Sequence, residues 1–553
     1  MCAIFAWIDH QRPPAEARAT VVQRGRLQRH RGPDWSGAFD DDRFALAHER
    51  LAIVDPKSGE QPLVSPDGRY VLAVNGEIYN HQELRAAHPA WPYQTESDAE
   101  VILPLYAAHG REMVKHLRGM FAFVLVDTVT GEYLVARDPY GICPLYLGRD
   151  DQGGLLVASE LKALVGMARS VVVFPPGHAL ARGDEAPVAW FERSWTDFEA
   201  VTDADRNPAA LRTALVDSVR SHLMSDVPYG VLLSGGLDSS VVSAIAARYA
   251  RRRVESGGQD EAWWPRLHSF SIGLPDSPDL AAAAEVAAGL GTVHHGFTYS
   301  IQEGLDAIAD VIYHLETFDV TTIRAGTPMY LMARRIRAMG IKMVLSGEGS
   351  DEIFGGYLYF HKAPNARAFH DETVDKLAGL HRYDCLRANK AMAAWGVEAR
   401  VPFLDTAFVD HAMAIPAKHK MVGKRGIEKE ILREAFQGWI PDRILWRQKE
   451  QFSDGVGYGW IDAIREWADV QVTDAQLRDA ASRFPVGTPK TKEAYVYRSR
   501  FEEHFPLPSA AATVPNEDGI ACSTAAALAW DESFRDTPDP SGRAVRAVHE
   551  DAY

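Results

Sequence analysis

The sequence predicts a β-rich α+β domain, then an α/β domain with a mainly parallel sheet, and a short tail. Short apolar runs bounded by Gly, Asp and Asn occupy 71–74, 121–126 and 133–136, with a helical pattern over 98–108. From about residue 229 to 345, strand patterns alternate with longer helical patterns, which is typical of a parallel sheet. A chain of 553 residues is also too long for a single core.

Proline-containing turn or loop signals at 175–177 and 203–208 precede the predicted second domain. Apolar residues from Leu211 to Leu223 recur every four residues and predict an amphipathic helix. We expect strands near 229–233, 267–273 and 341–345, and helices over 239–250, 279–290 and 326–339. The predicted domains are 2–200 and 205–510, followed by a mobile tail over 511–553, where periodicity is lost.

Composition excludes several classes of protein. The net charge is −16, from 59 Lys and Arg against 75 Asp and Glu, so binding along a nucleic-acid backbone is not expected. The sequence contains no apolar stretch near the roughly 20 residues of a membrane span, and no basic, then apolar, signal segment. Four widely spaced cysteines fit a reducing compartment. We expect a cytoplasmic protein with no membrane partner.

Cys2 follows the initiator methionine directly. A small residue at position 2 favours removal of Met1, which would leave a cysteine with a free α-amine. That amine has an unperturbed pKa of about 7.7–8.0 and can accept the thiol proton, so one residue would hold both nucleophile and base. Taken alone, Cys2 also fits a small apolar residue at the start of a strand.

A thiol that attacks an amide needs an oxyanion hole and side chains that bind the substrate. Asn75 and Gly76 directly follow the predicted strand 71–74, where an amide and a glycine N–H can face an oxyanion. The alternative is a type I′ hairpin turn, although residues 77–80 read as a helix start. Arg50 can bind a carboxylate bidentately or lie on the surface. Asp98 can hold an ammonium or cap a helix.

The opening Cys-x-Ile and the motifs at 29–34, 50–51, 75–80 and 97–98 resemble the class II, N-terminal-nucleophile glutamine amidotransferases. The resemblance implies a four-layer αββα sandwich in which Cys2 attacks the glutamine side-chain amide, with Asn75 and Gly76 at the oxyanion. The glutamine-binding residues that it implies are Arg50, Leu51, Ala52, Ile53, Val54, Asn75, Gly76, Glu77 and Asp98. Arg50 would hold the α-carboxylate, and Glu77 and Asp98 the α-ammonium. Ala3 and Ala6 depart from that family, which usually shows glycine at one or both of these positions.

A second chemical motif follows the strand 231–233. Residues 234–240, Ser-Gly-Gly-Leu-Asp-Ser-Ser, form a glycine-rich loop before a helix, which presents backbone N–H groups to an anion. Asp238 can hold magnesium. A generic tight turn explains the glycines but not the hydroxyls and the acid. The sequence contains neither a Walker motif nor a GxGxxG at a strand end.

A second loop, 346–352, follows the strand 341–345 and is rich in Ser, Gly and acids. Acids beside a phosphate site require a metal or a cationic group between them. Lys449 is a candidate cation, with a surface lysine as the alternative. His294 and His295 have no third ligand at metal spacing, so we expect them to be structural.

Residues 234–239 resemble the pyrophosphate loop of ATP pyrophosphatases. Together with 346–352, 396–405 and 447–452, they resemble the bacterial type B, glutamine-hydrolysing asparagine synthetases over about residues 2–510. This implies synthesis of L-asparagine from L-aspartate, L-glutamine and MgATP through β-aspartyl-AMP, giving glutamate, AMP and pyrophosphate. Ammonia would pass from Cys2 through a tunnel, and the enzyme would be a homodimer.

By position, the resemblance implies ATP contacts from Leu232, Ser234, Gly235, Gly236, Asp238, Ser239, Ile272, Ser346, Gly347 and Lys449. Asp238 and Asp351 would hold magnesium, and Glu348 would support adenylate formation. Two alternatives stay open: a related ligase that adenylates another carboxylate, and a glutaminase or amidohydrolase whose second domain only binds nucleotide. The presence of Cys2 together with Arg50, Asn75 and Asp98 argues against relatives that have lost glutaminase function. The acids of both loops argue against simple nucleotide binding.

Overall fold

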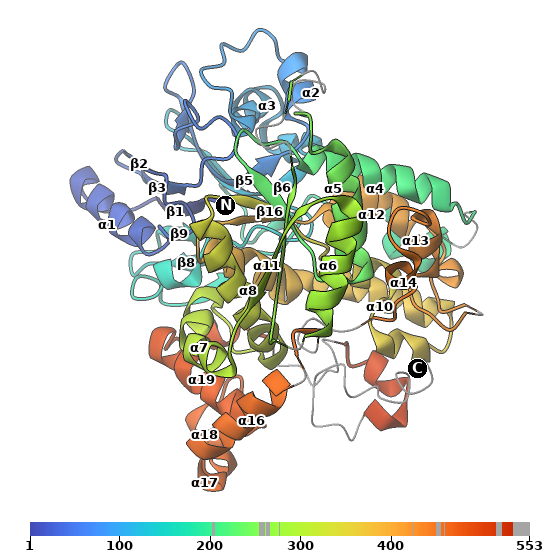
Figure 1. Cartoon of the computed structure of the whole chain (residues 1–553). Helices are drawn as coiled ribbons and strands as arrows, with labels where there is room; N and C mark the ends of the chain where they lie inside the picture. The colour runs from blue at the N-terminus through green and yellow to red at the C-terminus, as the bar shows by residue number, and fades with distance from the viewer. Residues whose placement is uncertain are drawn as a thin grey trace.

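The computed structural model describes residues 1–201, 205–253, 260–261, 266–275, 277–423, 425–449, 455–457, 459–515 and 523–534. Its first part contains two six-stranded antiparallel sheets (Figure 1). One sheet has the order β10 (Val171–Val173), β8 (Tyr146–Arg149), β9 (Leu155–Ala158), β1 (Ala3–Ile8), β3 (Phe44–Arg50), β2 (Trp35–Asp40). The other has the order β12 (Val188–Ala189), β11 (His178–Ala181), β7 (Tyr133–Arg137), β6 (Gly119–Asp127), β5 (Tyr70–Ile78), β4 (Leu63–Val64).

The two sheets stack face to face between helices. Ile4 and Ala6 of β1 share a buried cluster with Val71 and Ala73 of β5. The intervening residues of β1 turn to the other face and pack on α1 (Pro14–Arg26), while those of β5 pack on α3 (Ile102–His109). Because side chains alternate along a strand, each sheet has an inner and a helix-covered face. The αββα prediction is confirmed.

Strand β5 is longer than the sequence indicated. Asn75 and Gly76 lie within it, opposite Ala122 and Phe121 of β6, and α2 (His81–Ala87) starts only at His81. Both the strand end at residue 74 and the hairpin alternative are therefore wrong, because the ladder with β6 continues to Ile78. Gly76 has a φ of 140°, and a Cβ there would lie 2.0 Å from the Met120 carbonyl oxygen, so the close pairing requires glycine.

The second part is built on a five-stranded parallel sheet with the order β15 (Val293–Thr298), β14 (His268–Gly273), β13 (Tyr229–Leu232), β16 (Met343–Leu345), β17 (Glu398–Arg400). One face of the sheet packs on α5 (Leu237–Tyr249) and α6 (Pro278–Leu290), and the other on α8 (Val320–Ala338) and α11 (Asp384–Ala393). The predicted α/β domain is confirmed, including α4 (Pro208–His222) before it. Edge strand β15 was not predicted, because it is partly exposed and polar and therefore contains no apolar run.

The remaining helices of the described chain complete the second domain. They are α7 (Ile301–Leu315), α9 (Ser350–Phe354), α10 (Ala366–Gly379), α12 (Thr406–Met413), α13 (Glu430–Ala435), α14 (Asp442–Leu445), α16 (Gly459–Gln471), α17 (Asp474–Arg478), α18 (Ala480–Arg483), α19 (Lys492–His504) and α20 (Pro508–Ala511). None of the helices in the described ranges combines the length and low polarity that a membrane crossing requires.

Helix α11 joins the two domains. The Asn389 side chain donates to the Ile142 carbonyl at 2.8 Å and accepts from Arg31 at 2.9 Å. Lys390 donates to the Tyr146 hydroxyl at 2.8 Å and also pairs with Glu316. These buried polar contacts fix the first domain against the helix that borders the second site.

The described part of the predicted tail packs against the second domain. Val514, Ala527 and Phe534 are buried, and Thr524 donates to Glu372. The prediction of mobility also covers 516–522 and 535–553, which lie outside the described residues. The domain limits likewise stay a prediction, since 202–204 lie outside the described ranges.

Candidate active sites

Cys2 lies buried at the start of β1. Its Sγ is 3.8 Å from the Leu51 carbonyl oxygen, and its own carbonyl accepts from Arg31 Nε at 2.9 Å. Burial raises the pKa of the Cys2 thiol to about 11, although the neighbouring Met1 ammonium lowers it. The thiol is therefore protonated near neutral pH and needs a base before it can attack.

Met1 is fully buried, and its α-amino group forms an ion pair with Glu398 of β17 at 3.2 Å. Figure 1 shows the N-terminus where the two domains meet, close to β16. While Met1 is attached, the Cys2 nitrogen belongs to a peptide bond and cannot act as a base. Removal of Met1, which the sequence predicts, would turn this nitrogen into a free amine beside the thiol.

Asn75 is buried, and both its side-chain oxygen and nitrogen lack a hydrogen-bond partner within the described part of the chain. Buried polar atoms are usually paired, so an unpaired amide in a strand interior needs a specific reason. The strand β5 that holds it lies across from β3, where His48 Nε2 is 2.8 Å from the Val74 carbonyl oxygen. An amide left free beside the thiol's sheet fits a donor for a developing oxyanion.

Arg50 is buried rather than on the surface, so that alternative is wrong. Its Nη2 donates to the carbonyls of Val54 at 3.0 Å and Asp55 at 2.6 Å, which positions the guanidinium. A Cβ on Gly59 would lie 2.4 Å from Nη2, so the loop closes tightly on it. The rest of the proposed glutamine-binding loop, Leu51, Ala52, Ile53 and Val54, lies beside it, with the first three buried.

The two acids of this site are held differently. Asp98 accepts from the Ile78 amide at 2.6 Å, and the helical turn that it begins is capped by Ser97, so Asp98 is not the cap. Glu77 pairs through Oε1 with Arg400 of the second domain at 3.2 Å. Burial raises the pKa of both carboxyls, and Glu398 raises them further.

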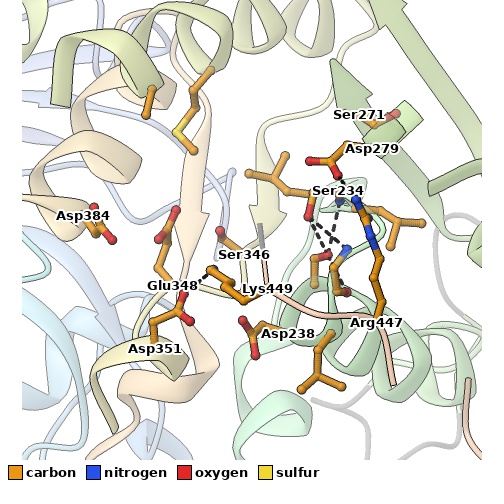
Figure 2. Close-up of a pocket in the computed structure, with 18 of the residues that line it drawn as sticks. Ser234, Asp238, Ser271, Asp279, Ser346, Glu348, Asp351, Asp384, Arg447 and Lys449 are labelled. Carbon is orange, nitrogen blue, oxygen red and sulfur yellow. Dashed lines mark hydrogen bonds and ion pairs between the residues drawn. The ribbon is translucent and has the colours of Figure 1, made fainter. Parts of the chain in front are cut away.

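The second site is a cavity at the carboxyl ends of the parallel strands (Figure 2). The loop after β13 forms one wall: Ser239 Oγ accepts from the Ser234 amide at 3.2 Å, and the start of α5 has no side-chain cap. Gly235 has a φ of 80° and packs closely against α6. A Cβ on Gly236, in contrast, would have only Ser234 Oγ within 4 Å, at 3.5 Å. This uncapped helix start with open space before it can accept a phosphate.

The acids of the second site are paired with two lysines, of which Lys429 is buried and Lys449 is partly buried. Lys429 Nζ lies 2.7 Å from Asp238 Oδ2 and 2.7 Å from Asp351 Oδ1, while Lys449 Nζ lies 2.6 Å from Asp351 Oδ2. Although burial opposes it, the two lysines hold the pKa of Asp351 well below its usual range. Lys449 is only partly exposed and is therefore not a free surface lysine.

Asp238 and Asp351 fit a magnesium ion in one respect. Magnesium is usually bound by one or two carboxylates together with substrate phosphates. Lys429 already bridges these two carboxylates, so they converge on one point where a cation is stabilised. The described residues offer no group of three or more metal-binding side chains.

Glu348 lies on the opposite wall of the cavity from Ser234 (Figure 2). Both its oxygens accept from Arg387 Nη2 of α11, at 3.2 and 3.1 Å, and Arg387 Nη1 donates to Asp384 at 2.6 Å. Burial raises the pKa of Glu348, and Arg387 opposes the rise.

The structure brings together nearly all the residues predicted for this site. The cavity is lined by Leu232, Ser234, Gly236, Asp238, Ser239, Ile272, Ser346, Gly347, Glu348, Asp351 and Lys449, whereas Gly235 turns the loop without lining it. His294 hydrogen bonds to serines of β14 and His295 to His268. These pairs agree with the structural role expected for both histidines.

Sequence reasoning missed Lys429, Arg387 and Asp384. Lys429 adopts a φ of 58°, which is rare for a residue with a side chain, and is buried between the two loops. No local motif marks it, because its partners are about 80 and 190 residues away. Arg387 and Asp384 sit on a helix whose pattern resembles any amphipathic helix.

Comparison with known proteins agrees with this arrangement. A glutamine amidotransferase domain model matches residues 1–174, and an asparagine synthase model matches 210–371 and 362–532. Asparagine synthetase B [glutamine-hydrolyzing] of Escherichia coli (strain K12) is 60% identical over 554 residues, covering all of both chains. The asparagine synthetase [glutamine-hydrolyzing] of Asparagus officinalis is 52% identical and covers all of this chain and 94% of its own.

Two solved structures are more distant. An allosteric regulatory enzyme of purine biosynthesis is 18% identical, with a TM-score of 0.31 over 54% of this chain and 80% of that one. An NAD+ synthetase from Burkholderia pseudomallei is 16% identical, with a TM-score of 0.22 over 50% of this chain and 94% of that one. At these scores neither structure carries an argument about function.

Proposed function

This chain belongs to the glutamine-hydrolysing asparagine synthetase family, and from that premise we propose how its two sites divide the reaction. The chain makes asparagine, uses ATP, and takes nitrogen from glutamine. We assign glutamine hydrolysis to the Cys2 site. We assign aspartate activation and amide formation to the cavity after β13 and β16.

At the first site, the free amine of Cys2 takes the thiol proton, and Sγ attacks the glutamine side-chain amide. Asn75 and the Gly76 N–H stabilise the oxyanion, and ammonia leaves as the thioester forms. Arg50 binds the glutamine α-carboxylate, and Asp98 with Glu77 faces the α-ammonium. Water then releases glutamate and restores the thiol.

At the second site, the uncapped start of α5 and the serines of 234–239 bind the ATP phosphates. The aspartate β-carboxylate attacks the α-phosphate, giving β-aspartyl-AMP and pyrophosphate. Lys449 stabilises charge that develops on the leaving pyrophosphate, and Glu348, held by Arg387, supports formation of the adenylate. Ammonia then displaces AMP to form asparagine.

Asp238 and Asp351 would hold magnesium, since they converge on one bridging cation. Bound magnesium would neutralise phosphate charge and orient the leaving group. Lys429 would then have to give up at least one carboxylate. A homodimer and a cytoplasmic location are further parts of the proposal, supported by the family resemblance and the composition.

The observation that carries the proposal is the buried amide of Asn75, which has no hydrogen-bond partner within the ranges that the structure describes. A strand interior rarely tolerates such a group, and its position suits an oxyanion donor for Cys2. Relatives without glutaminase function would not need it.

The direct test incubates the purified enzyme with aspartate, glutamine and MgATP and measures asparagine, AMP and pyrophosphate. We expect the three products in equal amounts. Formation of ADP and phosphate would remove the adenylate mechanism. Replacing aspartate by glutamate or other carboxylates tests the alternative acceptor, and intact-mass analysis should show a chain that starts at Cys2.

A further inference from the structure

A buried chain of charges crosses from the first domain to the second beside Cys2. The Met1 ammonium pairs with Glu398 Oε2 at 3.2 Å, Arg400 Nε donates to Glu398 Oε1 at 2.8 Å, and Arg400 Nη2 pairs with Glu77 Oε1 at 3.2 Å. All four groups have side-chain exposures of 6% or less. Glu77 Oε2 is buried and has no hydrogen-bond partner within the described ranges.

The net charge of this buried cluster depends on whether Met1 is present. With Met1 attached, two carboxylates face an ammonium and a guanidinium, and the four groups are neutral in sum. In a chain that starts at Cys2, two carboxylates face only Arg400, unless the new α-amine is charged. An α-amine that serves as a base must be neutral. A buried, uncompensated charge costs several kcal/mol, so the cluster must take up either a proton or a cation.

Met1 shows which cation this position accepts. Its ammonium sits one residue beyond the Cys2 nitrogen, on the side of the second domain, and its closest acid, Glu398, belongs to β17. We infer that Glu398, backed by Arg400, forms a transient binding site for the ammonia released at Cys2, held there as ammonium. This inference rests on the proposed glutamine hydrolysis and adds a residue to it.

The proton needed for this step is already present. Without a cation the cluster carries one proton on a carboxyl, and burial, with Glu398, favours protonation of Glu77 by raising its pKa. Carboxylic acid plus ammonia gives carboxylate plus ammonium on arrival. The reverse transfer returns the proton to the carboxylate and frees neutral ammonia for attack on the adenylate.

The same strand leads to the second site. Arg400 of β17 accepts at its carbonyl from the Ser346 amide at 2.8 Å, and Ser346 lines the ATP cavity. Glu398 and Ser346 are thus attached to adjacent parallel strands, β17 and β16. An ammonium held at Glu398 would lie at the start of a strand whose far end borders the second cavity.

The test compares Glu398→Gln with wild type for nitrogen transfer. Enzyme is given amide-¹⁵N glutamine, aspartate and MgATP with excess unlabelled ammonium, and the label in asparagine is measured. We expect the ratio of labelled to unlabelled asparagine to fall about tenfold, the scale of one charge-assisted hydrogen bond. Glutamine hydrolysis and ammonia-dependent synthesis should stay near wild type, and Glu398→Asp should recover part of the ratio.

Glu316→Gln is the matched control, because Glu316 is a buried interface acid paired with Lys162 and Lys390, away from Met1. It should leave the label ratio unchanged. An unchanged ratio in Glu398→Gln would overturn the inference. A loss of glutamine hydrolysis itself would show that Glu398 serves the Cys2 amine, and would also overturn it. Absence of glutamine-dependent synthesis in wild type would instead reject the proposed function.

A second measurement does not depend on activity. Crystals of the enzyme that starts at Cys2 are soaked in rubidium chloride, since rubidium has the charge and nearly the size of ammonium. We expect an anomalous peak at the Glu398 carboxylate in wild type and none in Glu398→Gln. The absence of a peak in wild type at saturating rubidium would contradict a cation site.

Discussion

At the Cys2 site the Asn75 amide lies buried without a hydrogen-bond partner among the described residues, whereas at the second site Asp238 and Asp351 are each ion-paired to a lysine. The first site stands on two stacked sheets, with Cys2 directly before β1, Arg50 at the end of β3, and Asn75 inside β5. The second stands on loops at the carboxyl ends of parallel strands, where open α/β sheets usually bind ligands.

This difference matches the two substrates. Glutamine presents a neutral amide whose oxygen becomes charged only during the reaction, so donors must be free in the resting enzyme. ATP presents a polyanion with a metal, and the acids of the second site are ion-paired to lysines. We therefore expect the first site to bind by filling unused donors, and the second by replacing existing ion pairs.

The largest effect should come from Cys2→Ala. Glutamine-dependent asparagine formation should fall about 10⁴-fold or more, as when a nucleophile is removed, while ammonia-dependent synthesis persists. Both rates are measured by asparagine formation under saturating MgATP. Cys143→Ala, at a buried cysteine of the same domain, serves as the control and should keep both activities. Loss of both in Cys2→Ala would mean that the sites are not separable.

Asp238→Ala should have the reciprocal effect. Pyrophosphate release should fall about 10²–10³-fold, because Asp238 would help to hold the magnesium that neutralises the charge on the leaving pyrophosphate. Glutamine hydrolysis, followed as glutamate, should persist. If glutamate production stopped as well, Asp238 would be acting through the fold rather than at the second site.

Asn75→Ala separates catalysis from stability. Glutaminase kcat should fall about 10²–10³-fold, with a small change in KM, as for other oxyanion donors. The melting temperature should stay constant or rise, because the lost amide has no hydrogen-bond partner in the described part of the chain. Asn389→Ala removes an amide with two partners and should lower the melting temperature. A clear loss of stability in Asn75→Ala would mean that its amide is paired.

Lys429→Met tests the exchange of ion pairs. The variant leaves two partly buried carboxylates with Lys449, which contacts only Asp351, as the remaining cation, and should lose about 2 kcal/mol of stability without metal. Magnesium alone should then raise its melting temperature more than that of wild type, since binding to the folded state stabilises it. Calorimetry with and without magnesium gives both values. An equal magnesium response in the two proteins would argue against a cation site between these acids.

The smallest effects concern pH. Burial raises the pKa of Asp98, so its charge opposes folding at neutral pH and this cost disappears as pH falls through the raised value. The lysines lower the pKa of Asp351, so its stabilisation is present above the unfolded value of about 3.9 and is lost as pH falls. At pH 7, Asp98→Asn should raise the free energy of unfolding and Asp351→Asn should lower it, and urea unfolding at pH 7 and pH 4 measures both. A stability change of the same sign in both variants would contradict the opposite roles of the two acids.

Both candidate sites could largely be predicted from the sequence, because each of their motifs is a short run of neighbouring residues. Cys2 could be recognised because the residue before it is the initiator methionine, and the loop 234–239 because its residues are local. The burial of Arg50 and the length of β5 depend on packing and strand pairing that no local pattern reveals. Lys429 and Glu398 gain their roles only from partners distant in sequence.

The central claim is that two distinct sites in one chain are joined by internal transfer of ammonia. It is tested most directly by mixing Cys2→Ala with Asp238→Ala in the presence of an ammonia trap, glutamate dehydrogenase with NADH and 2-oxoglutarate. Asparagine is measured from glutamine, aspartate and MgATP. We predict that wild type keeps most of its synthesis under the trap, whereas the mixture makes asparagine only without it. Equal suppression of wild type and mixture would contradict internal transfer.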